Sequence, residues 1–439
     1  MEYKNSFLII VFVCSILGIL VAVLSNDLYY EEMIKEKPTI IRDNQKKDDN
    51  QKKEKEKENV KEKEKEKENV KEKEKKNENE NEEKNKNNEE SKNNPQSVDQ
   101  KDKNEAIKKS DFILDDDDDD LEDENGYHTI HIALNIDNKF IYPCIVFLTS
   151  LLDNRKNSTI YHIHILTSKD FSQDNINKIN TLINKFGKDF LKINFINMHN
   201  AFEGAMTNQY ISTTSYYRIR LPSLLSDVDR VLYIDTDAIN FADLTEMYNL
   251  ELNDNIFLRG ALDNVENIAE LRNFGLRTSK YMNAGILLMH LKSMRKFGIE
   301  EKITNFVNTH YLEHHDQTAI NAVCHNNFGI LSIKYATFCF DKFENMVKYN
   351  NKQDKRYRYS EAELQQAYYE PTLLHYVGWV KPWDRGNNIK YAEYWWYYAK
   401  QTDYYEDILH HYGFNKINVE ALLKKIPKDG GLLKRKFMK

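Results

Sequence analysis

A long run of charged and polar residues confines the fold of this chain to the residues that follow it. Residues 44–126 consist almost entirely of Lys, Glu, Asn, Asp and Gln, and QKKEKEKENV at 51–60 is nearly repeated as KEKEKEKENV at 61–70. Such a segment has too few aromatic and branched side chains to offset the conformational entropy that folding removes. We therefore predict a disordered, extended stem over residues 25–126 and a folded body from Tyr127 onward.

An uncharged apolar stretch precedes this stem. Residues 7–24, FLIIVFVCSILGILVAVL, carry no charge, and Lys4 lies just before them. Their length fits the roughly 17–25 residues of a membrane-spanning helix, and the basic flank should stay in the cytosol. We predict a type II signal anchor with a cytosolic tail at 1–6 and a luminal body in the endoplasmic reticulum, Golgi or another secretory compartment. A cleaved signal peptide, with an apolar core of usually about 7–15 residues, is the alternative.

Charge and cysteine content argue against two kinds of site. The net charge is −7, and Asp111–Glu124 holds ten acidic and no basic residues, so the rest of the chain sums to +3. A near-neutral body without a basic stripe does not favour nucleic-acid binding. Outside the apolar stretch, Cys144, Cys324 and Cys339 allow at most one disulfide and lack the CxxC spacing of a metal site.

The body alternates between strand-like and helix-like patterns. Strand patterns occupy 128–136, 160–166, 190–197 and 231–234, and helix patterns occupy 142–152 and 170–187. Strand–helix alternation predicts an α/β fold with a parallel, doubly wound sheet. In open sheets of this kind, ligands bind at the carboxyl ends of the strands.

Two carboxylates stand at that predicted edge. Asp235 and Asp237 end the apolar run VLYI at 231–234. Two close carboxylates disfavour each other's ionised form unless a cation lies between them, and carboxylate oxygens suit Mg²⁺ or Mn²⁺. The D-x-D pattern alone is weak, because Asp115–Asp120 contains it within the segment that cannot fold. A turn pair after a strand is the alternative, and the position at the strand end is what favours a metal site.

Four further motifs accompany this pair. They are TTSYYRIRLPSLL at 213–225, YMNAGILLMHL at 281–291, HHDQTAINAV at 314–323 and LLHYVGWVKPW at 373–383. With these motifs, residues 128–384 resemble glycosyltransferase family 8, a group of retaining transferases with the GT-A fold, and look most like its bacterial lipopolysaccharide glucosyl- and galactosyltransferases. The resemblance implies a GT-A, Rossmann-like domain over 127–390 with a mostly parallel central sheet flanked by helices.

The resemblance implies a metal site and a UDP-sugar donor. Asp235 and Asp237 would bind Mn²⁺, or Mg²⁺, which would bridge to the donor's diphosphate, and His375 would be the third protein ligand. Taken alone, His375 is more typical of a satisfied buried histidine.

The same resemblance places three residues beside the diphosphate. Gly378 would let the backbone approach phosphate closely, Lys381 would supply a point charge, and Arg218 would lie near phosphate and sugar. The alternatives from the residues themselves are a surface position for Lys381 and an ion pair of Arg218 with Asp227 or Asp229.

The remaining implied contacts are to sugar and nucleoside. Asn283, Asp316 and Gln317 would bind the donor sugar, with Gln317 nearest the anomeric carbon. Asp137 and Asn138 would contact base and ribose. An ordinary helix-surface amide is the alternative for Gln317.

The implied activity is that of a retaining hexosyltransferase. It would move glucose or galactose from a UDP-sugar to a glycan, lipid or protein acceptor. The family's mechanism is open between a covalent intermediate and front-face departure and attack, and the amide of Gln317 favours the front-face hypothesis. A protein that binds nucleotide sugars without transfer, and a self-glucosylating primer of glycogenin type, are the alternatives.

Residues 391–439 are predicted to form a helical extension that is aromatic and then basic. At helical spacing, most rings of 391–414 are expected to be packing contacts, with a sugar-stacking or membrane-interface patch as the alternative. The closing LLKRKFMK is predicted to be a solvated tail, although its basic character would also suit anionic lipid.

Overall fold

The computed structural model describes residues 126–205, 213–386 and 389–433. The predicted anchor at 7–24 and tail at 1–6 lie outside these ranges, as does the predicted stem apart from Gly126. Within the described ranges, none of the helices combines the length and the apolar character that crossing a bilayer requires.

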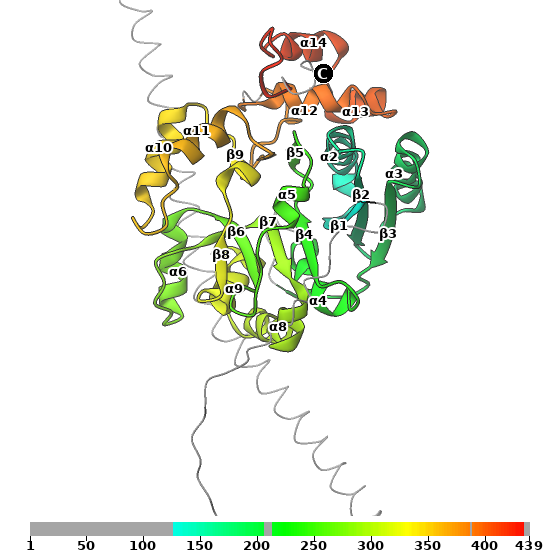
Figure 1. Ribbon diagram of the computed structural model, residues 1–439. Coiled ribbons are helices and arrows are strands. Elements are labelled where there is room, and N and C mark those ends of the chain that lie inside the picture. The colour runs from blue at the N-terminus through cyan, green and yellow to red at the C-terminus, as the bar shows by residue number, and fades with distance from the viewer. Residues whose placement is uncertain (1–125, 206–212, 387–388, 434–439) are drawn as a thin grey trace, which may run out of the picture. The chain divides into compact units, whose positions relative to one another are not determined.

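A seven-stranded sheet forms the centre of the molecule, in the order β3-β2-β1-β4-β7-β6-β8 (Figure 1). Its strands are β1 (His128–Ile136), β2 (Thr159–Thr167), β3 (Leu191–Asn197), β4 (Arg230–Ile234), β6 (Leu258–Leu262), β7 (Met282–His290) and β8 (Phe328–Ile330). The sheet is mostly parallel, as predicted, but β7 runs antiparallel to both β4 and β6. A purely parallel sheet, which the alternation suggested, is therefore wrong at this strand.

The link between β6 and β7 explains the reversed strand. Residues 263–281, which include α6 (Ile268–Asn273), leave the sheet at the carboxyl end of β6 and re-enter it at that same end, so Leu262 pairs with Met282. A connection that re-enters at the same end gives antiparallel neighbouring strands, whereas a crossover that re-enters at the opposite end gives parallel ones. As a result, the start of β7 lies beside the end of β4, where Asp235 follows.

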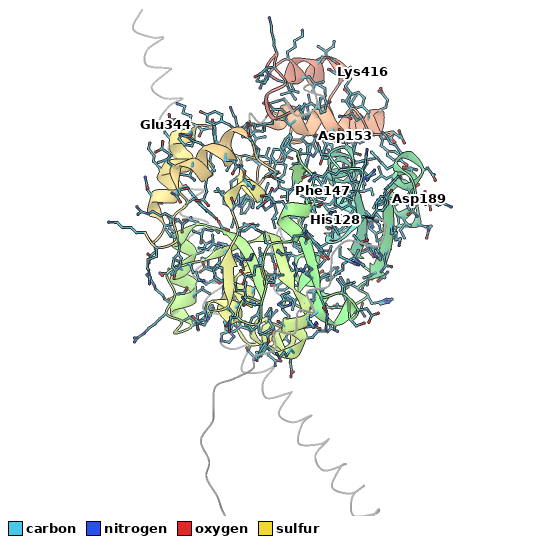
Figure 2. The ribbon with its side chains drawn as sticks, in the orientation of Figure 1. His128, Phe147, Asp153, Asp189, Glu344 and Lys416 are labelled. Atoms are coloured by element: carbon cyan, nitrogen blue, oxygen red, sulfur yellow. The ribbon has the colours of Figure 1, made fainter. Side chains whose placement is uncertain are left out.

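Helices cover both faces of the sheet. α2 (Ile141–Asp153) and α3 (Gln173–Phe186) pack on one face, and α4 (Leu221–Leu224), α7 (Leu291–Lys296), α8 (Ile299–Thr309) and α9 (His315–Cys324), with the 3₁₀ helix η2 (Thr213–Arg220), pack on the other. Alternate residues of β1 serve the two cores: Ile132 and Leu134 face α2, and Ala133 faces η2. Figure 2 shows the buried Phe147 of α2 inside and the exposed Asp189, Glu344 and Lys416 at the periphery.

A small second sheet, in the order β5-β10-β9, places the motif LLHYVGWVKPW (373–383) next to the end of β4. It consists of β5 (Ala238–Asn240), β9 (Thr337–Phe338) and β10 (Leu373–His375), with His375 paired opposite Ala238. Apart from three C-terminal α-helices, the other described elements are η1 (Asn138–Phe140), α5 (Thr245–Tyr248), η3 (Val265–Asn267), η4 (Ile333–Tyr335), α10 (Phe343–Lys352), α11 (Glu361–Tyr369) and η5 (Gly431–Leu433). Pairing with β5 is what places His375 next to Asp237.

The aromatic C-terminal segment is helical and packs on the domain. It forms α12 (Ala392–Ala399), α13 (Tyr405–Tyr412) and α14 (Lys416–Leu423), seen beyond the end of α2 in Figure 1. Trp395 and Trp396 are fully buried in one cluster with Val146 of α2 and Leu374 of β10. The prediction that most rings of this segment are packing contacts is confirmed. Cys144, Cys324 and Cys339 are all free thiols.

Candidate functional site

Three potential metal ligands converge at the carboxyl end of β4. Asp235 follows β4, Asp237 precedes β5, and His375 ends β10. His375 Nε2 lies 3.2 Å from Asp237 Oδ1 and 3.9 Å from Asp235 Oδ2. One ligand atom from each residue lies within 4.8 Å of the others. The structure thus brings together the three residues that the sequence assigned to a metal.

A glycine of β7 makes this convergence sterically feasible. Gly285 pairs with the residue after β4, since Asp235 N donates to Gly285 O at 2.7 Å. A Cβ at Gly285 would stand 2.2 Å from His375 Cε1 and 2.7 Å from Asp235 Oδ2. The sequence analysis missed this role, although Gly285 lies inside the YMNAG motif. A glycine within an otherwise apolar strand was the available signal, because it often marks a close approach.

The three residues fit a divalent cation. Asp237 Oδ1 is buried and faces His375 Nε2 at 3.2 Å, and His375 Nδ1 is buried and makes no hydrogen bond to any described residue. Asp235 Oδ1 accepts from Tyr233 Oη at 2.5 Å, so its other oxygen remains available. Two carboxylates and one imidazole form an oxygen-rich donor set, which suits Mn²⁺ or Mg²⁺ better than a thiophilic ion.

Lys381 supplies positive charge at the same point. Its Nζ donates to Asp237 Oδ2 at 2.5 Å and to Tyr376 O at 2.7 Å. The alternative of a free surface lysine is therefore wrong. Gly378, in the loop between Tyr376 and Lys381, has φ of 89° and open space at its Cβ position. This left-handed conformation favours glycine.

Two carboxyls of the site have pKa values shifted in opposite directions. Burial by itself would raise the pKa of Asp237, but Lys381 and His375 outweigh it and hold that pKa below its usual value. Burial raises the pKa of Asp316 to about 6, although Arg218 acts against the rise. Asp237 is therefore kept as an anion, whereas the charge of Asp316 depends on its arginine.

Arg218 links the metal side of the site to α9. Its Nε lies 2.9 Å from Asp316 Oδ2, and its Nη2 lies 3.5 Å from Asp235 Oδ1. Nη1 donates to the backbone oxygen of Ala284. The alternative of a pair with Asp227 or Asp229 is wrong, because this guanidinium points into the site instead. Arg218 thus holds one buried carboxyl, that of Asp316, and one partly exposed carboxyl, that of Asp235.

The two predicted sugar-binding amides share one carboxylate. Asp263 Oδ2 accepts from Asn283 Nδ2 at 3.0 Å and from Gln317 Nε2 at 3.1 Å. Gln317 Oε1 in turn accepts from Ala284 N at 2.9 Å, so this amide is not an ordinary surface group. The sequence analysis missed Asp263, which follows β6. Its position after a strand was a signal of the same kind as that of Asp235.

Asp137 and Asn138 follow β1 at the level of the carboxylates that follow β4, because Ala133 pairs with Tyr233. Asp137 Oδ1 caps η1 by accepting from Lys139 N at 2.9 Å. Asn138 Oδ1 accepts from Ser172 N at 3.0 Å, and Asn138 Nδ2 donates to Asp170 O at 2.9 Å. Their backbone lies at the correct edge for a nucleoside, while their side chains brace the loop. The base and ribose contacts stay a prediction.

Comparison with known proteins identifies the family. The model of Glycosyl transferase family 8 matches residues 131–386, more than half of the chain. The chain belongs to glycosyltransferase family 8. It is therefore a glycosyltransferase, and such enzymes use a nucleotide-sugar donor and typically a divalent cation.

Relatives support the family. General stress protein A of Bacillus subtilis (strain 168) is 26% identical over 282 residues, which cover 62% of this chain and 94% of that protein. Lipopolysaccharide 1,3-galactosyltransferase of Salmonella typhimurium is 22% identical over 262 residues, 58% of this chain and 72% of that protein. The crystal structure of galactosyltransferase LgtC with donor and acceptor sugar analogues matches with a TM-score of 0.53 at 22% identity, covering 62% of this chain and 96% of LgtC. This structural likeness shows the GT-A-like fold.

In this family 8 enzyme, Asp263→Ala should lower kcat by about 10²-fold, because no side-chain oxygen is left to accept from the two amides, which can then turn. Steady-state kinetics with donor at saturation would measure the change. Tyr349→Phe is the matched control, since it removes only the hydroxyl that donates to Asp263 Oδ1 at 3.2 Å. Equal losses in the two variants would contradict a special role for the amide contacts.

Proposed function

We propose that this family 8 enzyme is a Mn²⁺-dependent, retaining hexosyltransferase that moves glucose or galactose from a UDP-sugar to a glycan, lipid or protein acceptor. The observation that carries the proposal is the convergence of Asp235, Asp237 and His375 beside the network of Asp263 and its two amides. The first three side chains suit a cation that is bound to a diphosphate, and Asp263 with its two amides suits the hydroxyls of a sugar. Mg²⁺ is the alternative ion.

In the proposed reaction, the residues around the metal site mainly neutralise the negative charge of the diphosphate. Asp235, Asp237 and His375 would hold the cation, which when bound acts as a Lewis acid toward the leaving UDP. Lys381 lies at the same carboxylate and would add a fixed positive charge where negative charge develops. Gly378 leaves the loop backbone open to phosphate, and Arg218 fixes the position of Asp235.

The contacts of the proposed sugar-binding residues Asp316 and Gln317 favour front-face transfer. In that reaction the bond from the anomeric carbon to UDP breaks, the acceptor oxygen bonds to the same face, and the acceptor proton passes to the departing phosphate oxygen. Gln317 presents an amide that is held at both ends, and the carboxylate of Asp316 is paired with Arg218. Neither residue offers a free carboxylate as a nucleophile. A glycosyl adduct trapped on any residue of the chain would contradict this mechanism.

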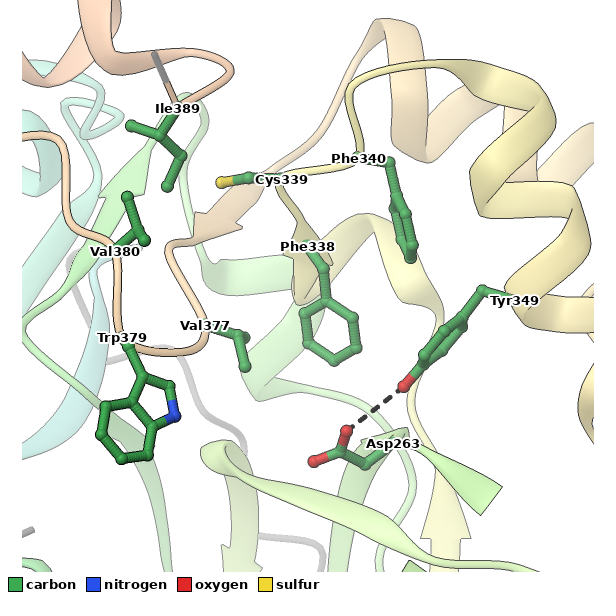
Figure 3. A pocket seen from close by; sticks show the side chains of 9 residues that line it. All are labelled: Asp263, Phe338, Cys339, Phe340, Tyr349, Val377, Trp379, Val380 and Ile389. Carbon is green, nitrogen blue, oxygen red and sulfur yellow. Dashed lines mark hydrogen bonds between the residues drawn. The ribbon is translucent and has the colours of Figure 1, made fainter. Parts of the chain in front are cut away.

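A hollow of about 320 Å³ next to Asp263 is the proposed acceptor site (Figure 3). Aromatic and aliphatic side chains line it: Phe338, Phe340, Tyr349, Val377, Trp379, Val380 and Ile389, together with Cys339. Trp379 lies on the loop that also carries Gly378, and 66% of its surface is exposed. An exposed ring beside a transfer site offers a flat face on which a sugar ring can stack.

Trp379→Ala should raise the KM for acceptor by roughly 5–10-fold, the loss of about 1 kcal/mol of ring contact, and leave the KM for donor nearly unchanged. Initial rates at varied acceptor and fixed donor would measure it. Tyr369→Ala is the control, since that ring on α11 is also exposed, at 58%, and lies outside the hollow. A rise in donor KM instead would place Trp379 on the nucleotide side.

UDP release by the purified full chain tests the proposed function. We expect one UDP-hexose of a panel to turn over, with Mn²⁺ required, and the Asp235→Asn/Asp237→Asn variant to be inactive although folded. Turnover that is independent of divalent cation would overturn the metal assignment. UDP binding without turnover of any sugar would favour the non-catalytic alternative. Hexoses found on the purified chain itself by mass spectrometry would favour the self-glucosylating alternative.

The predicted location follows from residues outside the described part of the chain. We retain the proposal that residues 7–24 anchor the enzyme as a type II membrane protein with a luminal catalytic domain. Protection of the domain from added protease in sealed microsomes would be the expected result, and digestion without detergent would contradict it.

A further inference from the structure

Three histidines form a cluster on the sheet, away from the transferase site. His162 and His164 are two residues apart on β2 and so face the same side, and His131 pairs with His162 across the β1–β2 ladder. His131 lies six residues before Asp137, which places the cluster about 20 Å along the strand from the carboxyl edge. No residue of the proposed transfer mechanism belongs to this cluster.

The ring nitrogens of the cluster lie at distances close to those of metal ligands. His131 Nδ1 and His164 Nε2 are 3.0 Å apart, and one nitrogen of each of the three rings lies within 4.8 Å of the others. Two imidazoles on one zinc ion, at about 2.0–2.1 Å each, have nitrogens about 2.9–3.4 Å apart for angles between 90° and tetrahedral. The ring centroid of His162 lies 5.0 Å from that of His131 and 4.4 Å from that of His164, so its nitrogen needs to come only a short way closer to complete a three-nitrogen site.

The cluster has one buried nitrogen without a partner. His164 is 3% exposed, and its Nδ1 makes no hydrogen bond to any described residue. The contact with His131 engages the other nitrogen of this ring. The nitrogen of His164 that faces the other rings is therefore Nε2, and its unpartnered Nδ1 adds the cost of a second buried polar atom. Ordinary core packing does not explain three adjacent imidazoles, because apolar side chains would fill that space without the cost of burying polar nitrogens.

From this geometry we propose that His131, His162 and His164 bind a late first-row divalent cation of the Zn²⁺ type, as a second metal site distinct from Asp235, Asp237 and His375. Three imidazoles select Zn²⁺, Co²⁺, Ni²⁺ or Cu²⁺ and discriminate against Mn²⁺ and Mg²⁺, which prefer oxygen. The ion would tie β1 to β2. Water would complete its coordination from the side where His131 and His162 are partly exposed.

The charge state of the rings agrees with the site. Burial lowers the pKa of His131 to about 4 and that of His164 to about 3, with smaller contributions from the neighbouring histidines, so both are neutral near pH 7. Neutral imidazole is the form that binds metal. Lys192 of β3, which pairs with His162 of β2, carries a positive charge that would repel a bound cation. Its side chain is exposed, so water and salt screen this repulsion.

Cobalt titration of the purified full chain tests the proposal. The chain would first be given excess Mg²⁺, which should fill the oxygen-rich site of Asp235, Asp237 and His375. Co²⁺ would then be titrated in, and the visible absorption of nitrogen-bound Co²⁺ would be recorded. We expect one equivalent of Co²⁺ to give these bands. His162→Gln should weaken binding by more than the roughly 10–100-fold that loss of a ligand's hydrogen-bonding partner costs.

Three further variants make the result specific. Asp235→Asn/Asp237→Asn and His410→Gln, which removes an exposed histidine of α13, should both keep the bands. Lys192→Gln keeps all three histidines and should tighten Co²⁺ binding severalfold at low salt, because it removes a positive charge. This variant decides the matter if His162→Gln does not fold. Bands that survive in folded His162→Gln, bands that vanish in the double aspartate variant, or unchanged affinity in Lys192→Gln would overturn the proposal.

Discussion

Gly285→Ala is expected to lower turnover by about 10²-fold or more while the domain stays folded. The new Cβ would stand 2.2 Å from His375 Cε1, whereas carbon atoms at contact lie about 3.5–4.0 Å apart. One partner must therefore move by more than about 1 Å, and a displacement of that size at a reacting centre costs about 10²-fold. β10 is paired on both sides, with β5 and β9, so His375 cannot withdraw easily.

The measurement is kcat/KM for the donor together with Mn²⁺ affinity and a circular dichroism spectrum. Gly329→Ala on β8 is the matched control, because its Cβ would meet the side chain of Arg259, which can swing away. We expect this control to keep most of the activity. Full Mn²⁺-dependent turnover by Gly285→Ala would mean that His375 is not a ligand.

Arg218→Met should lower the free energy of unfolding by about 3 kcal/mol and abolish transfer. Arg218 and Asp316 have side chains only 6% and 5% exposed, so the change leaves a buried carboxyl without its partner. Breaking a buried pair in this way costs about 3–5 kcal/mol. We expect the lower end, because burial already raises the pKa of Asp316 to about 6 and the carboxyl can take up a proton once Arg218 is gone. Urea unfolding at pH 7 would measure the loss.

A neighbouring arginine separates burial from ion pairing. Arg220 Nε lies 2.9 Å from Glu300 Oε1, the same distance as in the buried pair, but its side chain is 45% exposed. Arg220→Met should therefore cost at most about 1 kcal/mol. The double variant Arg218→Met/Asp316→Asn should regain part of the stability and none of the activity. Equal costs for Arg218→Met and Arg220→Met would show that the interior pair is not desolvated.

Local sequence patterns were sufficient for the class of fold. The strand predicted at 128–136 has the bounds of β1, the strand predicted at 231–234 begins one residue later than β4, and the helix predicted at 142–152 differs from α2 by one residue at each end. These elements are recognisable because period-2 and period-3.6 patterns depend only on neighbouring residues. The reversed direction of β7 was not recognisable, because it depends on how residues 263–281 return to the sheet edge.

The amino-acid sequence by itself determined that a folded body extends from Tyr127 onward and, through its motifs, pointed to one site for Asp235, Asp237 and His375. Composition and motif order are properties of the chain, so they can be read without coordinates. Only the tertiary structure decided that Gly285 makes room for His375, that Asp263 joins the two amides, and that three histidines of β1 and β2 meet. Those contacts join residues that are far apart in the chain or on adjacent strands, and the register of the sheet, rather than any local pattern, brings them together.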